Sequence, residues 1–196
     1  MDLSQNYLSG EVSTQLGSLR PLEVLELSSN NIMGPVPGFI GRLSILTNLY
    51  LLNNKISGFI PREVGMLKSF KYMFLQNNRI TGCIPSSIGN MSSLMTLQLS
   101  NNNLIGSIPV EIGMLESLRE LDLSDNYLSG SITTTLGNLS TLAFLHFYGD
   151  QLSGHIPEEV GGMRSLLHFE LPENNLTGSI PETIRRLGNL TVLFLT

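Results

Sequence analysis

The 196-residue sequence contains one cysteine, no tryptophan and only 14% charged residues. A single cysteine excludes a disulfide framework within the chain and a zinc site built from several cysteines. The net charge of −5 argues against a nucleic-acid-binding protein, which needs a basic surface to attract phosphates. No apolar run approaches the roughly 18 residues of a membrane-spanning helix, so we expect no direct membrane contact. Residues 1–10 (MDLSQNYLSG) have neither the basic start nor the apolar stretch of a secretory signal peptide.

What the sequence does contain is a repeat, because the same residue types recur every 24 residues. One column of the repeat is asparagine with a single exception: Asn6, Asn30, Asn54, Asn78, Asn102, Asn126, Asp150 and Asn174. A second column is glycine throughout: Gly10, Gly34, Gly58, Gly82, Gly106, Gly130, Gly154 and Gly178. A fixed period of this length predicts a solenoid in which each repeat adds one layer to a stack.

Each repeat carries the pattern L-x-L shortly before its asparagine, as in Leu97-Gln98-Leu99. Side chains alternate along a strand, so both leucines face the core and we expect parallel strands about 4.8 Å apart. An asparagine amide at the strand end can both donate to and accept from buried backbone groups. Ionised Asp150 can only accept, and we therefore predict that its repeat is the weak point of the column.

The second half of the repeat reads L-S-G-x-I-P with small variations, at residues 104–109, 152–157 and 176–181 for example. Together with the leucine pattern, it resembles the plant-type leucine-rich repeat of receptor-like kinases, receptor-like proteins and polygalacturonase inhibitors. Residues 148–166 are also similar to receptor-like kinases of the male-discoverer-interacting group.

The resemblance implies an α/β-class leucine-rich repeat solenoid of about eight repeats, forming a single domain over residues 1–196 with a right-handed superhelix. It also implies short additional strands at the G-x-I-P segments and helical turns on the convex side. Ser13 and Thr133 replace the family proline, so we expect the turns there to deviate. Members of the family usually begin with a paired-cysteine cap, which is missing. We therefore expect a solenoid uncapped at both ends, most simply a fragment of a longer ectodomain.

Recognition in such a scaffold is expected on the solvent-facing strand positions, because packing fixes the others. Two groups stand out there, with Gln98 between them. The first, the aromatic group, consists of Tyr50, Leu52, Tyr72 and Phe74, with Lys55, Lys71 and Arg79 expected nearby. An exposed apolar patch beside cations is typical of a binding site for a peptide or protein. The alternative is that aromatic residues simply suit a β-sheet.

The second, the histidine group, consists of Phe144, His146, Tyr148 and His168, flanked by Glu120, Asp122 and Glu170. Three interpretations are open: a solvated polar surface, a contact that changes with pH because histidine titrates between pH 5 and 8, and a metal site. We expect neither a metal nor any other cofactor, because no closely spaced ligand motif is present.

No nucleophile elbow or phosphate-binding loop is present, and we expect no enzymatic activity, although a longer parent protein could carry a serine/threonine kinase domain. The resemblance implies a segment of a receptor-like kinase or receptor-like protein at the plasma membrane. Such a segment binds an extracellular peptide or protein and docks with a leucine-rich repeat coreceptor. The alternatives are a stand-alone defence protein resembling polygalacturonase inhibitors and a nonfunctional gene fragment.

Two further features bear on this role. N-glycosylation acceptor motifs occur at Asn90, Asn138, Asn175 and Asn189, and they apply if the protein enters the secretory pathway. Charge is also uneven, because residues 1–98 carry 7 basic and 5 acidic residues (+2), whereas residues 99–196 carry 4 and 11 (−7). An extended ligand could use this gradient to choose its orientation.

Overall fold

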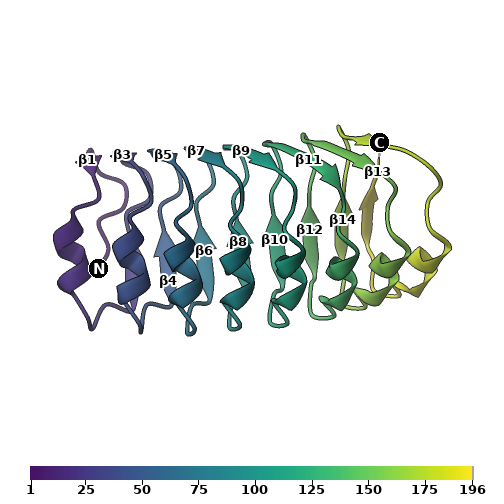
Figure 1. Ribbon diagram of the computed structural model, residues 1–196, viewed down its shortest axis with the longest axis horizontal. Helices are drawn as coiled ribbons and strands as arrows, with labels where there is room; N and C mark the ends of the chain where they lie inside the picture. Colours follow the sequence, from purple (N-terminus) through teal and green to yellow (C-terminus); the bar gives the residue numbers. More distant parts are fainter. Residues whose placement is uncertain (196) are drawn as a thin grey trace.

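Each repeat folds into one layer made of short strands and a 3-10 turn, and the layers stack side by side (Figure 1). The structure is a computed structural model that describes residues 1–195. Thr196, the last residue of the predicted domain, lies outside the described residues. The first and last layers lie at opposite ends of the long axis, so position in the sequence is also position along the molecule.

The L-x-L segments form a parallel sheet of eight strands in sequence order, which we call the concave sheet. Pairing joins equivalent residues of successive repeats, for example Leu121 with Leu97 and Leu145. The strands are β2 (Val24–Glu26), β4 (Asn48–Tyr50), β6 (Tyr72–Phe74), β8 (Thr96–Gln98), β10 (Glu120–Asp122), β12 (Phe144–His146), β14 (His168–Glu170) and β16 (Val192–Phe194).

A second parallel sheet of eight strands, the lateral sheet, runs along the upper edge in Figure 1. Its strands are β1 (Ser9–Glu11), β3 (Asn31–Gly34), β5 (Lys55–Gly58), β7 (Arg79–Gly82), β9 (Asn103–Gly106), β11 (Tyr127–Ser131), β13 (Gln151–Gly154) and β15 (Asn175–Leu176). We had expected these strands within the G-x-I-P segments. Most of them instead lie before those segments and end at the repeat glycine. The repeat glycine has a positive φ, 74° at Gly58, which ends the extended backbone.

Short 3-10 turns close the layers on the side opposite the concave sheet, as the family resemblance implies (Figure 1). They are η1 (Thr14–Ser18), η2 (Gly38–Arg42), η3 (Arg62–Met66), η4 (Ser86–Asn90), η5 (Val110–Met114), η6 (Thr134–Asn138), η7 (Glu158–Gly162) and η8 (Glu182–Arg186). The prediction that Ser13 and Thr133 distort their turns is wrong. Their φ/ψ angles of −58°/128° and −69°/137° are close to the −76°/130° of Pro37.

The core is one continuous ladder between the two sheets and the turns. In the central repeats, Leu97, Leu99, Leu104 and Ile112 are all 0% exposed. Burying such a side chain contributes about 1.5–3 kcal/mol to stability. Toward the chain ends the ladder opens, and Leu3 is 40% exposed.

The asparagine column lies at the turn after each concave strand and forms a hydrogen-bond ladder. The Nδ2 of Asn102 donates to the carbonyl oxygens of Leu75 (3.0 Å), Leu99 (3.0 Å) and Ser100 (3.2 Å). Its Oδ1 accepts from the N–H of Ile80 at 2.9 Å. The same pattern holds at Asn30, Asn54, Asn78, Asn126 and Asn174. Each layer is thereby tied to both of its neighbours.

Asp150 interrupts this ladder. Its Oδ1 accepts from the N–H of Leu128 at 2.7 Å, but its Oδ2 is buried without a hydrogen-bond partner. Burial raises the pKa of Asp150 to about 7; the negative charges of Asp125 and Asp122 also raise it, and the backbone N–H groups of Leu128 and Asn126 lower it. Above this pKa, an ionised carboxylate that cannot donate occupies the position where the other repeats place an amide donor.

Candidate functional site

Three rows of side chains on the concave sheet point away from the core. Strand pairing aligns the middle row as Glu26, Tyr50, Phe74, Gln98, Asp122, His146, Glu170 and Phe194. The same pairing aligns the row before it, which includes Tyr72, Glu120, Phe144 and His168. Leu52 and Tyr148 follow their strands in the third row. All twelve predicted ligand-binding residues are half-buried and lie on this face.

Two members of the aromatic group, Tyr50 and Phe74, pack directly against each other. The rings of Tyr50 and Phe74 stack with a centroid distance of 5.0 Å and an interplanar angle of 15°. The Nδ2 of Asn48 donates to the Tyr50 hydroxyl at 2.8 Å and fixes the direction of the phenol. The patch is half-buried rather than fully exposed, because strands about 4.8 Å apart press neighbouring rings together.

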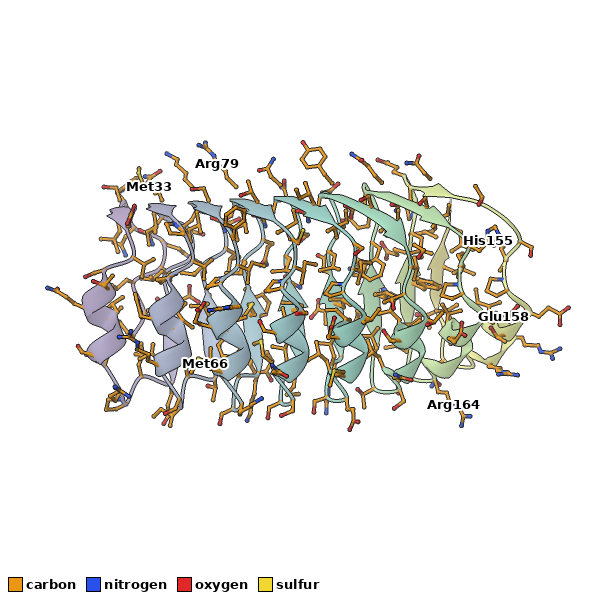
Figure 2. All side chains as sticks on the ribbon, in the orientation of Figure 1. Met33, Met66, Arg79, His155, Glu158 and Arg164 are labelled. Atoms are coloured by element: carbon orange, nitrogen blue, oxygen red, sulfur yellow. The ribbon has the colours of Figure 1, made fainter. Side chains whose placement is uncertain are left out.

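The cations expected beside the aromatic group lie in two different places. Lys55 and Arg79 begin strands β5 and β7 of the lateral sheet, and Figure 2 shows Arg79 at that edge. Their placement near the aromatic group is therefore wrong. The chain turns after each asparagine and carries the following residues onto the other sheet. Lys71 immediately precedes Tyr72 and is exposed.

A chain of side-chain hydrogen bonds follows the aromatic group across the sheet. The Nε2 of Gln76 donates to the Oε1 of Gln98 at 2.6 Å, and the Nε2 of Gln98 donates to the Oε1 of Glu120 at 2.7 Å. The Oε1 of Gln76 is buried without a partner. Gln76 was not among the predicted residues, although it occupies the third row. The Oδ1 of Asp122 accepts from the hydroxyl of Ser124 at 2.6 Å.

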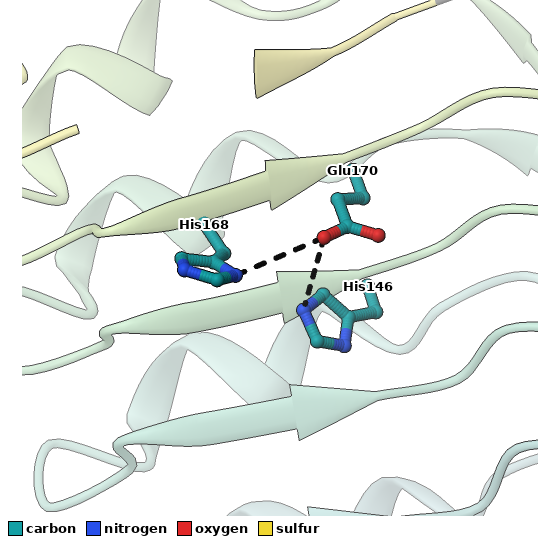
Figure 3. A group of neighbouring side chains, drawn as sticks. All are labelled: His146, His168 and Glu170. Carbon is teal, nitrogen blue, oxygen red and sulfur yellow. Dashed lines mark ion pairs between the residues drawn. The ribbon is translucent and has the colours of Figure 1, made fainter. Parts of the chain in front are cut away.

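The histidine group centres on strands β12 and β14. His146 lies opposite Glu170, and His168 lies two residues before Glu170 on the same face. The Nε2 of His146 and the Nδ1 of His168 each lie 3.8 Å from the Oε1 of Glu170 (Figure 3). The Phe144 ring meets the His168 ring edge-on, with centroids 5.0 Å apart. The structure thus joins residues that are one full repeat apart in the sequence.

The four glycosylation motifs lie away from the concave rows. Asn90 and Asn138 end turns η4 and η6, Asn175 begins β15, and Asn189 follows η8. All four are exposed, and the Nδ2 of Asn189 donates to the carbonyl oxygen of Arg164 at 2.9 Å. Glycosylation at these positions remains a prediction.

Comparison with known proteins agrees with this architecture. A family model described as a leucine-rich repeat region matches residues 4–154. The chain therefore belongs to the leucine-rich repeat family. No curated protein sequence matched it. None of the helices described in residues 1–195 is long and apolar enough to cross a membrane.

Within that family, the fold is similar to those of several solved receptors. The plant peptide hormone receptor RGFR1 in complex with RGF2 is 35% identical over 98% of this chain and 31% of the receptor, with a TM-score of 0.96. A TDR receptor is 34% identical over 99% of this chain and 34% of the receptor, with a TM-score of 0.96. The Arabidopsis receptor kinase HAESA, solved with the peptide hormone IDA and the co-receptor SERK1, is 33% identical over 100% of this chain and 33% of HAESA, with a TM-score of 0.94. This chain spans about a third of the length of each of these solved receptor chains.

Proposed function

We propose that this chain is a ligand-recognition segment of a plant leucine-rich repeat receptor kinase or receptor-like protein, and that it binds an extracellular peptide or protein on the concave sheet. One observation carries the proposal. The leucines, asparagines and glycines of each repeat are committed to packing, whereas the solvent-facing rows of the concave sheet differ from repeat to repeat. Those rows form a continuous surface along the stack. The peptide hormones bound to RGFR1 and HAESA support this role.

The order of the side-chain groups along the concave sheet suggests which of them an extended ligand contacts in turn. An extended peptide that crosses the strands meets the aromatic group first, then the Gln76–Gln98–Glu120 chain, and then the histidine group. The stacked pair of Tyr50 and Phe74 offers an apolar face for an anchoring side chain.

Charge on the same surface narrows the ligand class. The strand positions from 120 to 122, 144 to 146 and 168 to 170 hold Glu120, Asp122 and Glu170 but no lysine or arginine. A neutral or basic ligand is therefore favoured over an acidic one. The proposed role is recognition, with an extracellular location and a leucine-rich repeat coreceptor; the HAESA complex likewise contains a co-receptor. Kinase chemistry would belong to another domain of the parent protein.

A displayed library of random peptides tests this proposal. The purified chain is used for selection, and the enriched peptides are measured against two variants. The first, Tyr50→Ala with Phe74→Ala, changes the concave sheet. The second, Met33→Ser with Ile105→Ser, changes exposed residues of the lateral sheet and serves as the matched control. We expect only the first variant to lose the selected peptides. Peptides that bind both variants equally well would refute the concave site.

A further inference from the structure

The histidine group contains a set of side chains with the chemistry of a metal site. One ligand atom from each of His146, His168 and Glu170 lies within 4.8 Å of the other two. The three come from two paired strands, so the backbone that carries them is fixed by the parallel sheet. We propose that these three residues bind a divalent transition-metal ion, with Zn²⁺ as the representative ion.

The distances require a small adjustment on binding. Zinc binds histidine nitrogen and carboxylate oxygen at about 2.0–2.2 Å, so a tetrahedral ion holds its ligand atoms roughly 3.3 Å apart. The two nitrogen–oxygen distances to Glu170 are already 3.8 Å. All three ligand atoms lie within 4.8 Å of one another, so closing the set requires rotation about the side-chain bonds of His146 and His168. Figure 3 shows both rings directed toward the same carboxylate oxygen.

The direct contacts in this cluster leave one polar atom unsatisfied. The Nε2 of His146 is buried and has no hydrogen-bond partner among the described residues, because its 3.8 Å separation from Glu170 is too long for a hydrogen bond. A buried polar atom without a partner is rare in folded proteins and requires an explanation. A metal ion coordinated by this nitrogen supplies one.

The surroundings also suit a cation with an open coordination position. Side-chain exposures of 22% for His146, 36% for His168 and 20% for Glu170 leave the ion accessible from the concave side, where water can be the fourth ligand. Glu120 and Asp122 on the neighbouring strand β10 add negative charge. Two imidazoles favour zinc and related transition metals over Ca²⁺ and Mg²⁺, which prefer oxygen ligands.

The stacking of the layers, rather than a short sequence motif, assembles this site. In the sequence, His146 and Glu170 are separated by a complete repeat, so no short ligand motif marks them. Only the stacking of layers brings them together. The same arrangement excludes His155, which lies on the other side of the layer near the carbonyl oxygen of Thr177 (Figure 2).

Calorimetric titration with ZnCl₂ tests the site, using chain that is free of a polyhistidine tag and has been stripped with EDTA. We expect saturable binding of one Zn²⁺ per chain, which is lost in His146→Ala and in His168→Ala. Glu170→Gln should weaken binding by about tenfold or more, whereas the control variant His155→Ala should bind like the wild type. Circular dichroism confirms that each variant is folded. If His146→Ala unfolds, the more exposed His168→Gln decides instead.

Substitution with Co²⁺ provides a second readout, because a tetrahedral site gives intense visible absorption bands that hydrated Co²⁺ lacks. We expect these bands in the wild type and in His155→Ala but not in His168→Ala. Absence of saturable zinc binding by the wild type would overturn the proposal. Binding that persists in both His146→Ala and His168→Ala would overturn it equally.

Discussion

Replacing Asp150 with asparagine should stabilise the protein by completing the asparagine ladder. An asparagine at this position would occupy the place that Asn126 has one repeat earlier. The Nδ2 of Asn126 donates to three carbonyl oxygens at distances of 2.9–3.1 Å. By the 24-residue repeat, the equivalent acceptors for residue 150 are the carbonyl groups of Leu123, Phe147 and Tyr148. Asp150→Asn therefore adds a donor where several acceptors are already in place.

The expected gain follows from the contacts. A buried polar atom without a partner costs about 1–3 kcal/mol, and a new hydrogen bond contributes about 1 kcal/mol. Replacing Asp150 with asparagine removes the cost of burying Oδ2 without a hydrogen-bond partner, and the new amide forms at least one hydrogen bond. Because these effects overlap, we expect about 2 kcal/mol at pH 8. For a protein of this size, that raises Tm by about 4–8 °C.

The gain should depend on pH in one direction. The pKa of Asp150 is about 7 in the folded protein, compared with 3.8 for the free group. Between these values the folded state holds a proton that the unfolded state has released, so lowering the pH stabilises the wild type through this group. Protonated Asp150 can also donate from Oδ2 as an amide does. The advantage of Asp150→Asn is therefore largest above pH 7 and shrinks between pH 7 and pH 4.

Thermal unfolding of the two proteins from pH 4.5 to pH 8.5 measures this difference, and subtracting one curve from the other removes the contribution of the remaining carboxylates. Asn102→Asp, which places a carboxylate at an intact position of the ladder, is the matched control and should lower Tm. An equal Tm at pH 8.5 would refute the reasoning. A constant gain at every pH would show that Asp150 does not titrate in this range.

Three further predictions concern packing, turns and binding. Gly41→Ala should lower the free energy of unfolding in urea by about 2 kcal/mol, because the added Cβ would lie 2.6 Å from the carbonyl oxygen of Glu63. In the control Gly188→Ala the added Cβ has open space, so the free energy of unfolding should change little. Ser13→Pro should raise stability by about 0.5 kcal/mol, because the backbone already has the φ of proline; a lower Tm would show that the ring clashes. Binding of a basic peptide should weaken between 50 and 300 mM NaCl, about as expected for screened surface charges, and affinity that does not change with salt would contradict the acidic surface.

The repeat made much of this structure predictable. Asn102 and Leu97 recur at fixed intervals, so one copy of the pattern sets the register of every layer. The rows of the concave sheet followed directly from that register. The positions of individual side chains did not follow from the register, because neighbouring groups compete for the same hydrogen-bond partners. Asp122, for example, accepts a hydrogen bond from Ser124 two residues away.

Other errors arose where the chain changes direction. Lys55 lies only five residues after Tyr50, yet it belongs to the lateral sheet because the backbone turns at the asparagine. The sequence places His146, His168 and Glu170 in the rows of the concave sheet. The 3.8 Å distances from the two histidines to Glu170 depend on side-chain rotamers, which the sequence does not specify. Gln76 was missed because a single glutamine carries no distinctive pattern, and its role emerges only in the chain that it forms with Gln98 and Glu120.

The most direct test of recognition by the concave sheet is the affinity of one selected basic peptide, measured by calorimetry for three proteins. These are the wild type, the concave variant Tyr72→Ala with Phe74→Ala, and the lateral variant Met33→Ser with Ile105→Ser. We predict that Kd rises by about tenfold or more, or roughly 1.4 kcal/mol, in the concave variant and changes by less than about twofold in the lateral variant. Loss of affinity in the lateral variant, with the concave variant unchanged, would contradict the proposed function.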